Sequence, residues 1–554
     1  MVLYFFIFKQ LNFNMNNNHK NILLFEISWE VSNLVGGIHT VLASKIKYAK
    51  EYADEYYCIG PYKNTTEFVR EDAPPHLHNA IKELQEMGLT LHFGKWTPDS
   101  HTSCNCILVE MTGFEQNANS IKGMLWENHK IDSLHSDWFD FDEVMTWSWG
   151  CGIVCEKLSK QMNYSNTLVH SHEWMCSGAT FYFHQNNHLK VELSIRTVFT
   201  THATMLGRAY YGNFNELLMN KDIKDKSPYQ IAQELNVHTK YQTEHQALRF
   251  ADASSCVSPL SKDEIIKLYD YPQVNVTENG FNLDLSFDDC IKQFTNTHSK
   301  LTNSIQEYFE PFYKVKKHLR IGIISGRFEV KAKGYDTTFQ ALGELNNKLK
   351  EEDSSKEIVI LAPIMAGDYK PLEEEVQLDF NQHIAPLSKY NIELNHELMQ
   401  LCTQNGLLNR KEDKVRIILV PRTLDSQNKA FDMNYYQLLQ GCDFSLFPSG
   451  YEPWGYTPHE SIAYGVITLT SENAGFGRYW LHNKINNSVV RVVLGQDYNS
   501  KVEQIKEFIH EEYTKTAKTQ YREKKYALEY AKELQWSTLF ENYKYMYNSI
   551  IKND

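Results

Sequence analysis

Residues 451–480 read YEPWGYTPHESIAYGVITLTSENAGFGRYW, and this stretch predicts how the second half of the chain folds. The apolar run from Phe444 to Phe447 just before it is typical of a short buried strand. Glycines and prolines then favour a loop. A helix start follows, with a threonine N-cap, a proline at the first helical position and a glutamate three residues after the cap. These last residues are Thr457, Pro458 and Glu460.

Two carboxylates stand at this predicted junction of loop and helix. A helix N-terminus offers unpaired N–H groups and the positive end of the helix dipole, which suit a phosphate group. Glu452 lies in the loop and Glu460 in the first turn. Taken alone, Glu460 is a capping-box residue and Glu452 a solvated loop acid. Their spacing also allows a second interpretation, in which one carboxylate faces a reacting sugar and the other reaches a nucleoside.

A similar turn stands near the start of the chain. The run NILLFEIS at residues 21–28 predicts a buried strand, and Gly36 and Gly37 precede an amphipathic helical run. Such a glycine turn allows close approach of the backbone to a phosphate. Further strands are predicted at Tyr56–Gly60, Asn105–Glu110 and Thr167–His170. The alternation of strands and helices favours a parallel sheet.

Cations follow two of the predicted strands. His202 and Arg208 lie within the run VFTTHATMLGR, after its strand-like start, while Arg327 and Lys333 follow the strand HLRIGIISG. Open α/β sheets bind ligands at their carboxyl edge, where a guanidinium and an ammonium can hold a diphosphate. By contrast, VHSHEW at residues 169–174 offers histidines without a further ligand set, so no metal site is expected there.

Bulk composition limits the classes of function. At 554 residues the chain predicts two to four domains, and its net charge of −13 argues against nucleic acid or an anionic membrane as partner. The ten cysteines form no paired C-x2-C motif, which favours reduced thiols in the cytoplasm. The opening MVLYFFIF is too short to span a membrane. We expect residues 1–20 to be a disordered or mis-annotated leader, with Met15 as a plausible true start.

Four motifs together resemble the glycogen synthases of the animal and fungal type, glycosyltransferase family 3. They are EPWGYTPHE with AGFG, WEVSNLVGGI, TTHATMLGR and RFEVKAKGYD. The resemblance implies an α/β protein of the glycosyltransferase B fold, with two doubly wound, Rossmann-like domains facing a central cleft. It places an acceptor-side domain at 21–300 and a nucleotide-sugar domain at 301–530, with a helical insertion near 370–414. The C-terminal helix, 531–554, crosses back to the first domain.

The implied reaction is retaining transfer of glucose from UDP-glucose to the 4-hydroxyl of a non-reducing α-1,4-glucan end, as in glycogen. Neither a cofactor nor a metal is expected, and neither nucleic acid nor a membrane is a partner; homo-oligomerisation stays open. By resemblance the catalytic residues are Glu452, His202, Arg208, Arg327 and Lys333. By the same resemblance Tyr435 stacks on the uracil ring of the donor. The full set of implied donor-binding residues is Gly36, Gly37, Asn279, Tyr435, Trp454, Gly455, Tyr456, Thr457 and Glu460.

Departures from the family pattern leave alternatives open. Enzymes that use ADP-glucose carry a lysine before the paired glycines, where this chain has Val35. Glu278 replaces the proline of the family's TPNG turn, and Arg522 is the only arginine after Arg491, so activation by glucose 6-phosphate through an arginine-rich helix is not carried over. The alternatives are ADP-glucose as donor, another acceptor, or a catalytically silent glucan-binding relative.

Overall fold

The computed structural model describes residues 21–551, except 34–35, 64, 211–225, 317, 353–355, 368–383, 389, 391, 394–395, 426–428, 484, 486 and 496. The expected leader, Val35 and much of the expected insertion therefore lie outside the described residues. The chain forms two compact units. One runs to Phe199 and adds Phe250–Ala253 and the chain from Lys544; the other comprises Thr200–Arg249 and Ser254–Tyr543.

The first sheet has nine strands in the order β3-β4-β5-β2-β1-β6-β7-β8-β9. Strand β1 (Ile22–Ile27) has six buried residues and pairs in parallel with both β2 and β6, as the sequence pattern predicts. The antiparallel edge formed by β3 and β4 was not predicted. The other strands are β2 (Glu55–Pro61), β3 (Phe68–Arg70), β4 (Leu89–Trp96), β5 (Cys104–Met111), β6 (Asn166–His172), β7 (Ile195–Thr201), β8 (Ala253–Cys256) and β9 (Asn275–Val276).

Helices follow most strands of this sheet along the chain. The predicted glycine turn leads into α2 (Gly37–Tyr52), whose N-cap is Gly36. Helix α5 (Glu143–Met162) is buried over most of its length, and Trp147 donates its indole N–H to the carbonyl of Val109 on β5. The remaining helices are α3 (His78–Glu86), α4 (Ala118–His129), α6 (Ser177–Gln185), α7 (Asn187–Glu192), α8 (Met205–Ala209), α11 (Pro228–Glu234), α12 (His238–Phe250) and α13 (Pro259–Tyr269).

The second sheet is parallel throughout, in the order β14-β12-β10-β15-β16-β17. Alternate residues of β12 enter two separate cores: Ile358 and Ile360 pack on one face, Val359 and Leu361 on the other. This period of two is expected for a strand that is buried on both faces. The strands are β10 (Leu319–Ile323), β12 (Glu357–Ala362), β14 (Val415–Leu419), β15 (Phe444–Leu446), β16 (Ile467–Ser471) and β17 (Val490–Val493); β11 (Gly326–Arg327) and β13 (Ile364–Met365) form a small pair beside it.

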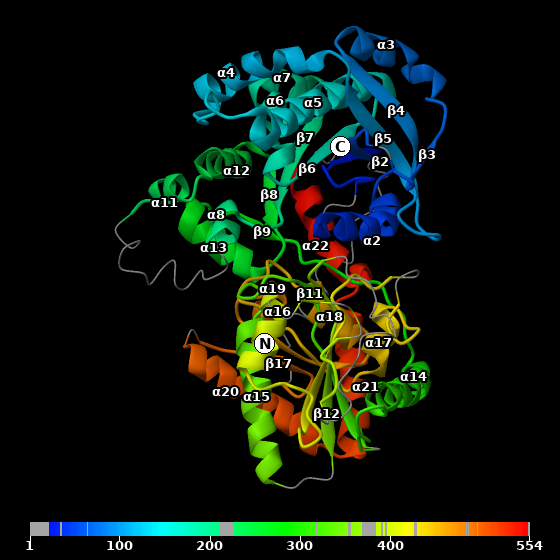
Figure 1. Ribbon diagram of the computed structural model, residues 1–554. Helices are drawn as coiled ribbons and strands as arrows, with labels where there is room; N and C mark the ends of the chain where they lie inside the picture. The colour runs from blue at the N-terminus through cyan, green and yellow to red at the C-terminus, as the bar shows by residue number, and fades with distance from the viewer. Residues whose placement is uncertain are drawn as a thin grey trace. The chain divides into compact units, whose positions relative to one another are not determined.

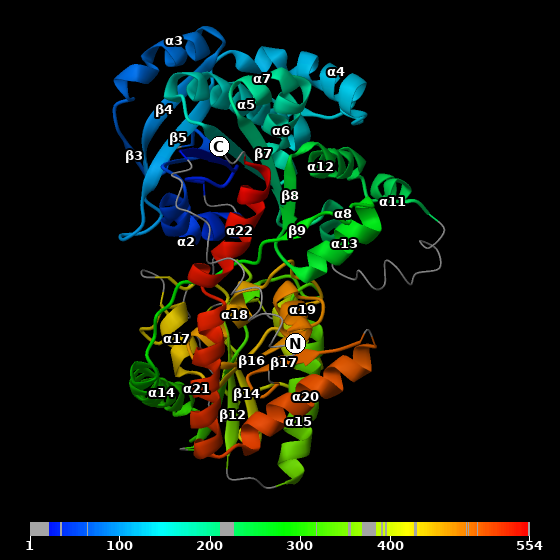
Figure 2. The same ribbon diagram turned by 180° about the vertical axis from the view of Figure 1, so that it is seen from behind.

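Helices cover both faces of this second sheet. Figure 1 shows α15 (Tyr335–Glu351) and α20 (Tyr498–Thr514) on one side and α14 (Phe287–Phe309) and α17 (Tyr435–Gly441) on the other. The view from behind in Figure 2 shows the same two layers. The second half is thus doubly wound, as predicted. The remaining helices are α16 (Glu397–Gln404), α18 (Tyr456–Ala463), α19 (Gly475–His482), α21 (Ala517–Glu533) and α22 (Trp536–Ile550).

Two local predictions are corrected by the structure. Helix α18 begins at Tyr456 with Gly455 as N-cap, so Thr457 is not the cap. Gly455 has φ +96°, a left-handed conformation that glycine adopts without strain, and this lets the chain turn into the helix earlier than predicted. Within 370–414, the described residues are helical only in α16. Across the described parts of 21–551, every helix is too short or too polar to span a bilayer.

Two helical glycines make a matched test of this packing. A Cβ on Gly343 of α15 would lie 2.1 Å from the backbone oxygen of Asn405, whereas a Cβ on Gly123 of α4 would meet nothing within 4 Å. We expect Gly343→Ala to lower the free energy of unfolding by about 1–3 kcal/mol through overpacking. Gly123→Ala should raise it by roughly 0.5–1 kcal/mol through helix propensity. Urea unfolding measures both; equal effects in the two variants would contradict the packing described.

Candidate functional site

An ion pair stands at the centre of the candidate site. The ammonium of Lys333 bonds to the Oε2 atom of Glu452, and the two side chains are 17% and 27% exposed. Both side chains keep a face toward solvent, so each can reach a ligand. The structure therefore brings together two residues that are 119 positions apart in the sequence.

Two turns pack closely to form this pair. The backbone N–H of Gly450 donates to the carbonyl of Ala332 over 2.9 Å, and Tyr451 N–H reaches the same carbonyl over 3.4 Å. Gly334 follows Lys333 with φ +68°, and a Cβ there would lie 2.3 Å from the backbone oxygen of Pro448. Only glycine fits this approach. The glycine after the lysine is thus required by the contact between the turns.

The AGFG segment holds Glu452 from the other side. Glu452 N–H donates to the carbonyl of Asn473 over 3.0 Å, and Gly475 N–H donates to the carbonyl of Glu452 over 2.8 Å. A Cβ on Gly475 would lie 2.0 Å from the backbone oxygen of Pro453. The backbone of Glu452 is therefore fixed like a strand residue between hydrogen-bonded neighbours, although it lies in a loop.

Arg327 lies at the end of β11, in the same unit as Lys333. Its side chain is 67% exposed and its Nε lies 3.3 Å from the Oε1 atom of Glu329. An exposed ion pair of this kind contributes little to stability. The guanidinium can therefore turn to an anionic ligand at small cost. The expected role of Arg327 as an anion contact stays a prediction.

The segment after β7 carries His202 and Arg208. His202 is buried, whereas Arg208, on the short helix α8, is exposed. Glu244, a buried residue of α12, holds this segment: it accepts the hydroxyl of Thr201 and, over 2.9 Å, the backbone N–H of Met205. The sequence predicted a histidine and an arginine at a strand end, and the structure places both there. No pattern in the sequence pointed to Glu244, the carboxylate that supports this segment.

Two tyrosines and a carboxylate lie together at the start of α17 and α18. The hydroxyl of Tyr436 donates to Glu460 Oε1 over 3.0 Å, and the rings of Tyr435 and Tyr436 meet edge to face at 5.3 Å. Burial raises the pKa of Glu460 to about 7. Ser325 donates its hydroxyl to Tyr435 over 3.3 Å. Tyr436 is 38% exposed and bonds directly to Glu460, a predicted donor-binding residue.

Other predicted donor residues differ in exposure. Trp454 is 3% exposed, and its indole packs on Phe476 as part of the core. Tyr456 and Thr457 lie in the first turn of α18 after Gly455. Asn279 is 4% exposed, and its Oδ1 has no hydrogen-bond partner among the described residues. Such a buried acceptor is a candidate ligand contact.

The residue that replaces the family's proline makes a contact of its own. Glu278 accepts a hydrogen bond from Asn542 of α22 over 2.7 Å, and burial raises its pKa to about 7. The adjacent Gly280 is packed so tightly that a Cβ would lie 2.7 Å from the Trp536 ring. The turn is therefore held by α22, without the rigidity of a proline.

The glycine turn belongs to the other compact unit. Glu30 Oε2 accepts the backbone N–H of Gly36 over 3.0 Å and that of His39 over 2.9 Å. A carboxylate therefore occupies part of the helix N-terminus at which a phosphate was predicted. Burial raises the pKa of Glu30, because the charged form lies away from solvent. Phosphate binding by Gly36 and Gly37 stays a prediction, and Glu30 would compete with it.

One group of described residues has the composition of a metal site. Ligand atoms of Glu26, His170 and His172 lie within 4.8 Å of one another, and all three residues are buried. The ammonium of Lys45 lies 2.5 Å from Glu26 Oε1, and Tyr56 donates its hydroxyl to Glu26 Oε2 over 2.6 Å. Lys45 supplies the positive charge that a metal would bring. The sequence singled out the histidines, but the group is a buried ion pair.

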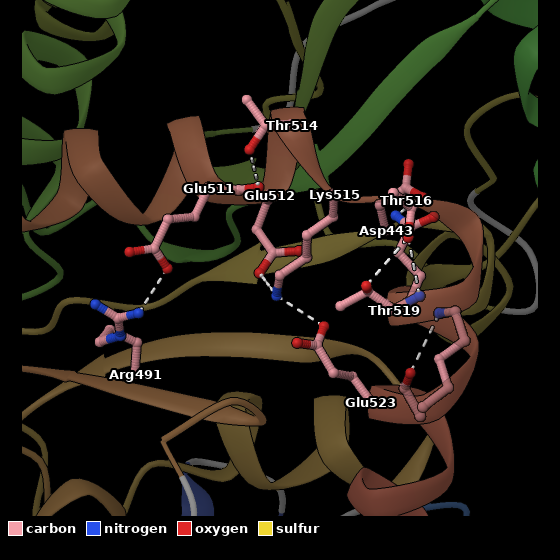
Figure 3. Close-up of polar contacts among 12 residues, drawn as sticks. Asp443, Arg491, Glu511, Glu512, Thr514, Lys515, Thr516, Thr519 and Glu523 are labelled. Atoms are coloured by element: carbon pink, nitrogen blue, oxygen red, sulfur yellow. Dashed lines mark hydrogen bonds and ion pairs between the residues drawn. The ribbon is translucent and has the colours of Figure 1, made fainter.

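A separate polar region lies where α20 meets α21. Figure 3 shows Lys515 between Glu512 and Glu523. The Nζ atom of Lys515 lies 2.7 Å from the Oε2 atom of Glu523. Burial raises the pKa of Glu512 to about 7.

A cavity of about 500 Å³ lies at the amino ends of the strands and is lined by Arg320, Lys356 and one face of α14. None of the predicted site residues lines it.

Comparisons with known proteins agree with the motifs. The family model described as glycogen synthase matches residues 26–376 and 371–552. The chain is 27% identical to liver glycogen [starch] synthase of Mus musculus, over 83% of this chain and 72% of that protein. It is 25% identical to glycogen [starch] synthase isoform 2 of Saccharomyces cerevisiae, over 84% of this chain and 76% of that protein.

The fold also agrees with a solved structure. The catalytic domain of starch synthase IV from Arabidopsis thaliana, bound to ADP and acarbose, matches with a TM-score of 0.57 at 12% identity. The match covers 96% of this chain and 99% of that one. The fold is the glycosyltransferase B fold, an α/β architecture with two Rossmann-like domains, as predicted.

The buried carboxyl group of Glu460 gives a pH-dependent prediction. Its pKa rises from 4.5 to about 7 on folding, so the folded state binds the proton more tightly. Stability is therefore lost as the pH rises from 4.5 through 7, by up to about 3 kcal/mol. Glu460→Gln should be more stable than the wild type at pH 8 and about equal to it at pH 4. Urea unfolding at both pH values measures this; a difference that does not change with pH would contradict it.

Proposed function

The chain belongs to the glycogen synthase family, and from this premise we propose that it transfers glucose from UDP-glucose to the 4-hydroxyl at a non-reducing α-1,4-glucan end, with retention of configuration. Its membership makes it a glycosyltransferase by fold and family. The donor, the acceptor and the stereochemistry are parts of the proposal. The observation that carries it is the ion pair between Lys333 and Glu452, two residues that the family motifs assign to catalysis.

The charges of the site suit this reaction. Glucosyl transfer breaks the bond from the anomeric carbon to the diphosphate, so positive charge develops on the sugar and negative charge on the leaving group. Lys333, Arg327 and Arg208 are cations that can stabilise the leaving diphosphate. Glu452 can stabilise the positive charge on the sugar. In the resting pair these opposite charges satisfy each other, and a bound donor would insert between them.

The nucleoside end supports a base-stacking role. Tyr435 and Tyr436 begin α17, and Glu460 can accept a ribose hydroxyl. A base that stacks on an aromatic ring gains roughly 1–3 kcal/mol. Stacking alone does not select uracil over adenine, so UDP-glucose rests on the likeness to the animal and fungal enzymes. We place the reaction in the cytoplasm, because all ten cysteines are free and buried.

No metal is part of this proposal. Three side-chain cations and the N-terminus of α18 can together meet the charge of a diphosphate. Activity that survives treatment with a chelator would support this point.

The central role of Glu452 is tested by one substitution. Glu452→Gln keeps the size of the side chain but removes the charge, so we expect turnover of UDP-glucose with glycogen to fall about a hundredfold or more. The thermal midpoint should stay near that of the wild type, because the backbone of Glu452 carries the structural bonds. Release of UDP measures the rate.

A matched control separates the site from ion pairs in general. Glu503 pairs with Lys506 on the exposed face of α20, where the two side chains are 54% and 21% exposed. Glu503→Gln should retain the turnover of the wild type. Near-normal turnover in Glu452→Gln would contradict the assignment of the site.

A further inference from the structure

A buried carboxyl group lies next to the catalytic loop and has no role in the reaction as described. Glu264 of α13 is 0% exposed. Its Oε2 accepts the hydroxyl of Thr204 over 2.7 Å and the hydroxyl of Tyr451 over 3.1 Å. Its Oε1 is buried and has no hydrogen-bond partner among the described residues. Three segments, α13, the start of α8 and the loop before α18, therefore meet at one carboxyl group.

Thr204 joins Glu264 to the turn that carries Arg208. It is the N-cap of α8, and its side chain accepts the backbone N–H of Gly207 over 3.0 Å. A Cβ on Gly207 would lie 2.5 Å from the hydroxyl oxygens of both Thr204 and Tyr451, and 2.8 Å from Glu264 Oε1. The three oxygens thus surround the residue just before Arg208, and only glycine leaves them room.

Tyr451 joins the same group to the ion pair. Its hydroxyl contacts Glu264, and its backbone N–H lies 3.4 Å from the carbonyl of Ala332, the residue before Lys333. Glu452 is the next residue in the chain. Tyr451 therefore connects the turn that carries Arg208 to the backbone next to Lys333 and next to Glu452. The positive charge of Arg208 also acts on the hydroxyl of Tyr451.

Structural support alone does not explain a carboxyl group here. A buried acid without a cationic partner costs stability, and an apolar side chain of similar volume commonly replaces such groups without loss. Glu264 accepts two hydroxyl groups that come from the two segments bearing Arg208 and Glu452. These two hydrogen bonds to Glu264 hold the two segments at a fixed distance from each other.

We propose that Glu264 and Tyr451 are positioning residues that hold the Arg208 turn against the Lys333–Glu452 pair during glucosyl transfer. This proposal rests on the proposed function, because it assigns Arg208 to the leaving group and Glu452 to the sugar. Neither residue touches the substrate. Both act by setting where the cation stands relative to the carboxylate.

Charged neighbours give the group a pH dependence. Burial, with a smaller contribution from the carboxylates of Glu244 and Asp263, raises the pKa of Glu264 to about 8, although the hydroxyls of Thr204 and Tyr451 act to lower it. Asp263 is partly offset by Arg478, 3.7 Å away, and Arg208 faces Tyr451. Well below this pH the carboxyl group of Glu264 is mostly protonated and neutral. As the pH rises through 8 it ionises and the cluster is disturbed, so turnover should fall on the alkaline side.

The first test removes one hydroxyl. Tyr451→Phe keeps the ring but breaks the link to Glu264, so we expect kcat to fall about tenfold or more and the KM for UDP-glucose to rise by up to about tenfold, because Arg208 is no longer held against the diphosphate. The thermal midpoint should stay close to that of the wild type. The matched control is Tyr513→Phe, which removes another buried hydroxyl, bonded over 3.3 Å to the carbonyl of Lys356 on the far side of this unit. That control should retain the kcat of the wild type.

The second test uses Glu264 itself. Glu264→Ala should lower kcat about tenfold or more, and Glu264→Gln, a neutral acceptor of the same shape, should restore it to within about threefold. The glutamine variant should also lose the decline in turnover above pH 8. A kcat of Tyr451→Phe equal to that of the wild type would overturn the proposal, as would a glutamine variant no more active than the alanine variant.

The proposal can fail separately from the proposed function. A wild-type protein that turns over UDP-glucose while Tyr451→Phe is unchanged refutes only the positioning role. A wild-type protein that is inactive with UDP-glucose refutes the proposed function, and calorimetry with UDP or ADP then tests the positioning role. If the role is correct, Tyr451→Phe weakens binding of the nucleoside diphosphate about tenfold, because Arg208 is displaced; unchanged affinity would overturn it.

Discussion

The site depends on the close approach of two turns, one ending at Lys333 and Gly334, the other running from Pro448 to Glu452. Backbone hydrogen bonds from the second turn to Ala332 leave no space for a side chain at Gly334. The ion pair between Lys333 and Glu452 follows from this backbone contact. An ammonium and a carboxylate held in this way supply opposite charges at the two ends of a breaking glycosidic bond, which is what preorganised electrostatic catalysis requires.

Buried carboxyl groups support the site from behind. Glu244 holds the segment after β7 through Thr201 and Met205, and Glu264 holds its continuation through Thr204. Neither carboxyl group is exposed, so each is effective only through the hydroxyl and amide groups it accepts. The residues that carry charge to the ligand are exposed or half-buried. This separation of buried carboxyl groups from exposed cationic side chains suits a site in which a rigid backbone positions side chains that can still move toward the ligand.

Sequence patterns predicted the parallel strands and the glycine turns because period-two burial and glycine punctuation are local signals. The family motifs named Lys333 and Glu452 as catalytic residues, but their ion pair was not predicted, since no local pattern joins residues so far apart. Glu264 lies in an ordinary helical sequence, PLSKDEIIKLY, and nothing there marks it as buried. Likewise Lys45 lies in an ordinary amphipathic helix, so its ion pair with Glu26 could not be predicted from the sequence. The start of α18 was misplaced because Gly455, in a left-handed conformation, caps the helix that Thr457 was expected to cap.

The central claim is that this chain moves glucose from UDP-glucose onto a glucan. The most direct measurement compares release of UDP and ADP from matched UDP-glucose and ADP-glucose, each with and without glycogen, using protein that starts at Met15. We expect release of UDP that depends on glycogen, with little release of ADP. Equal or greater release of ADP would contradict the donor assignment, and no release from either donor would contradict the claim as a whole.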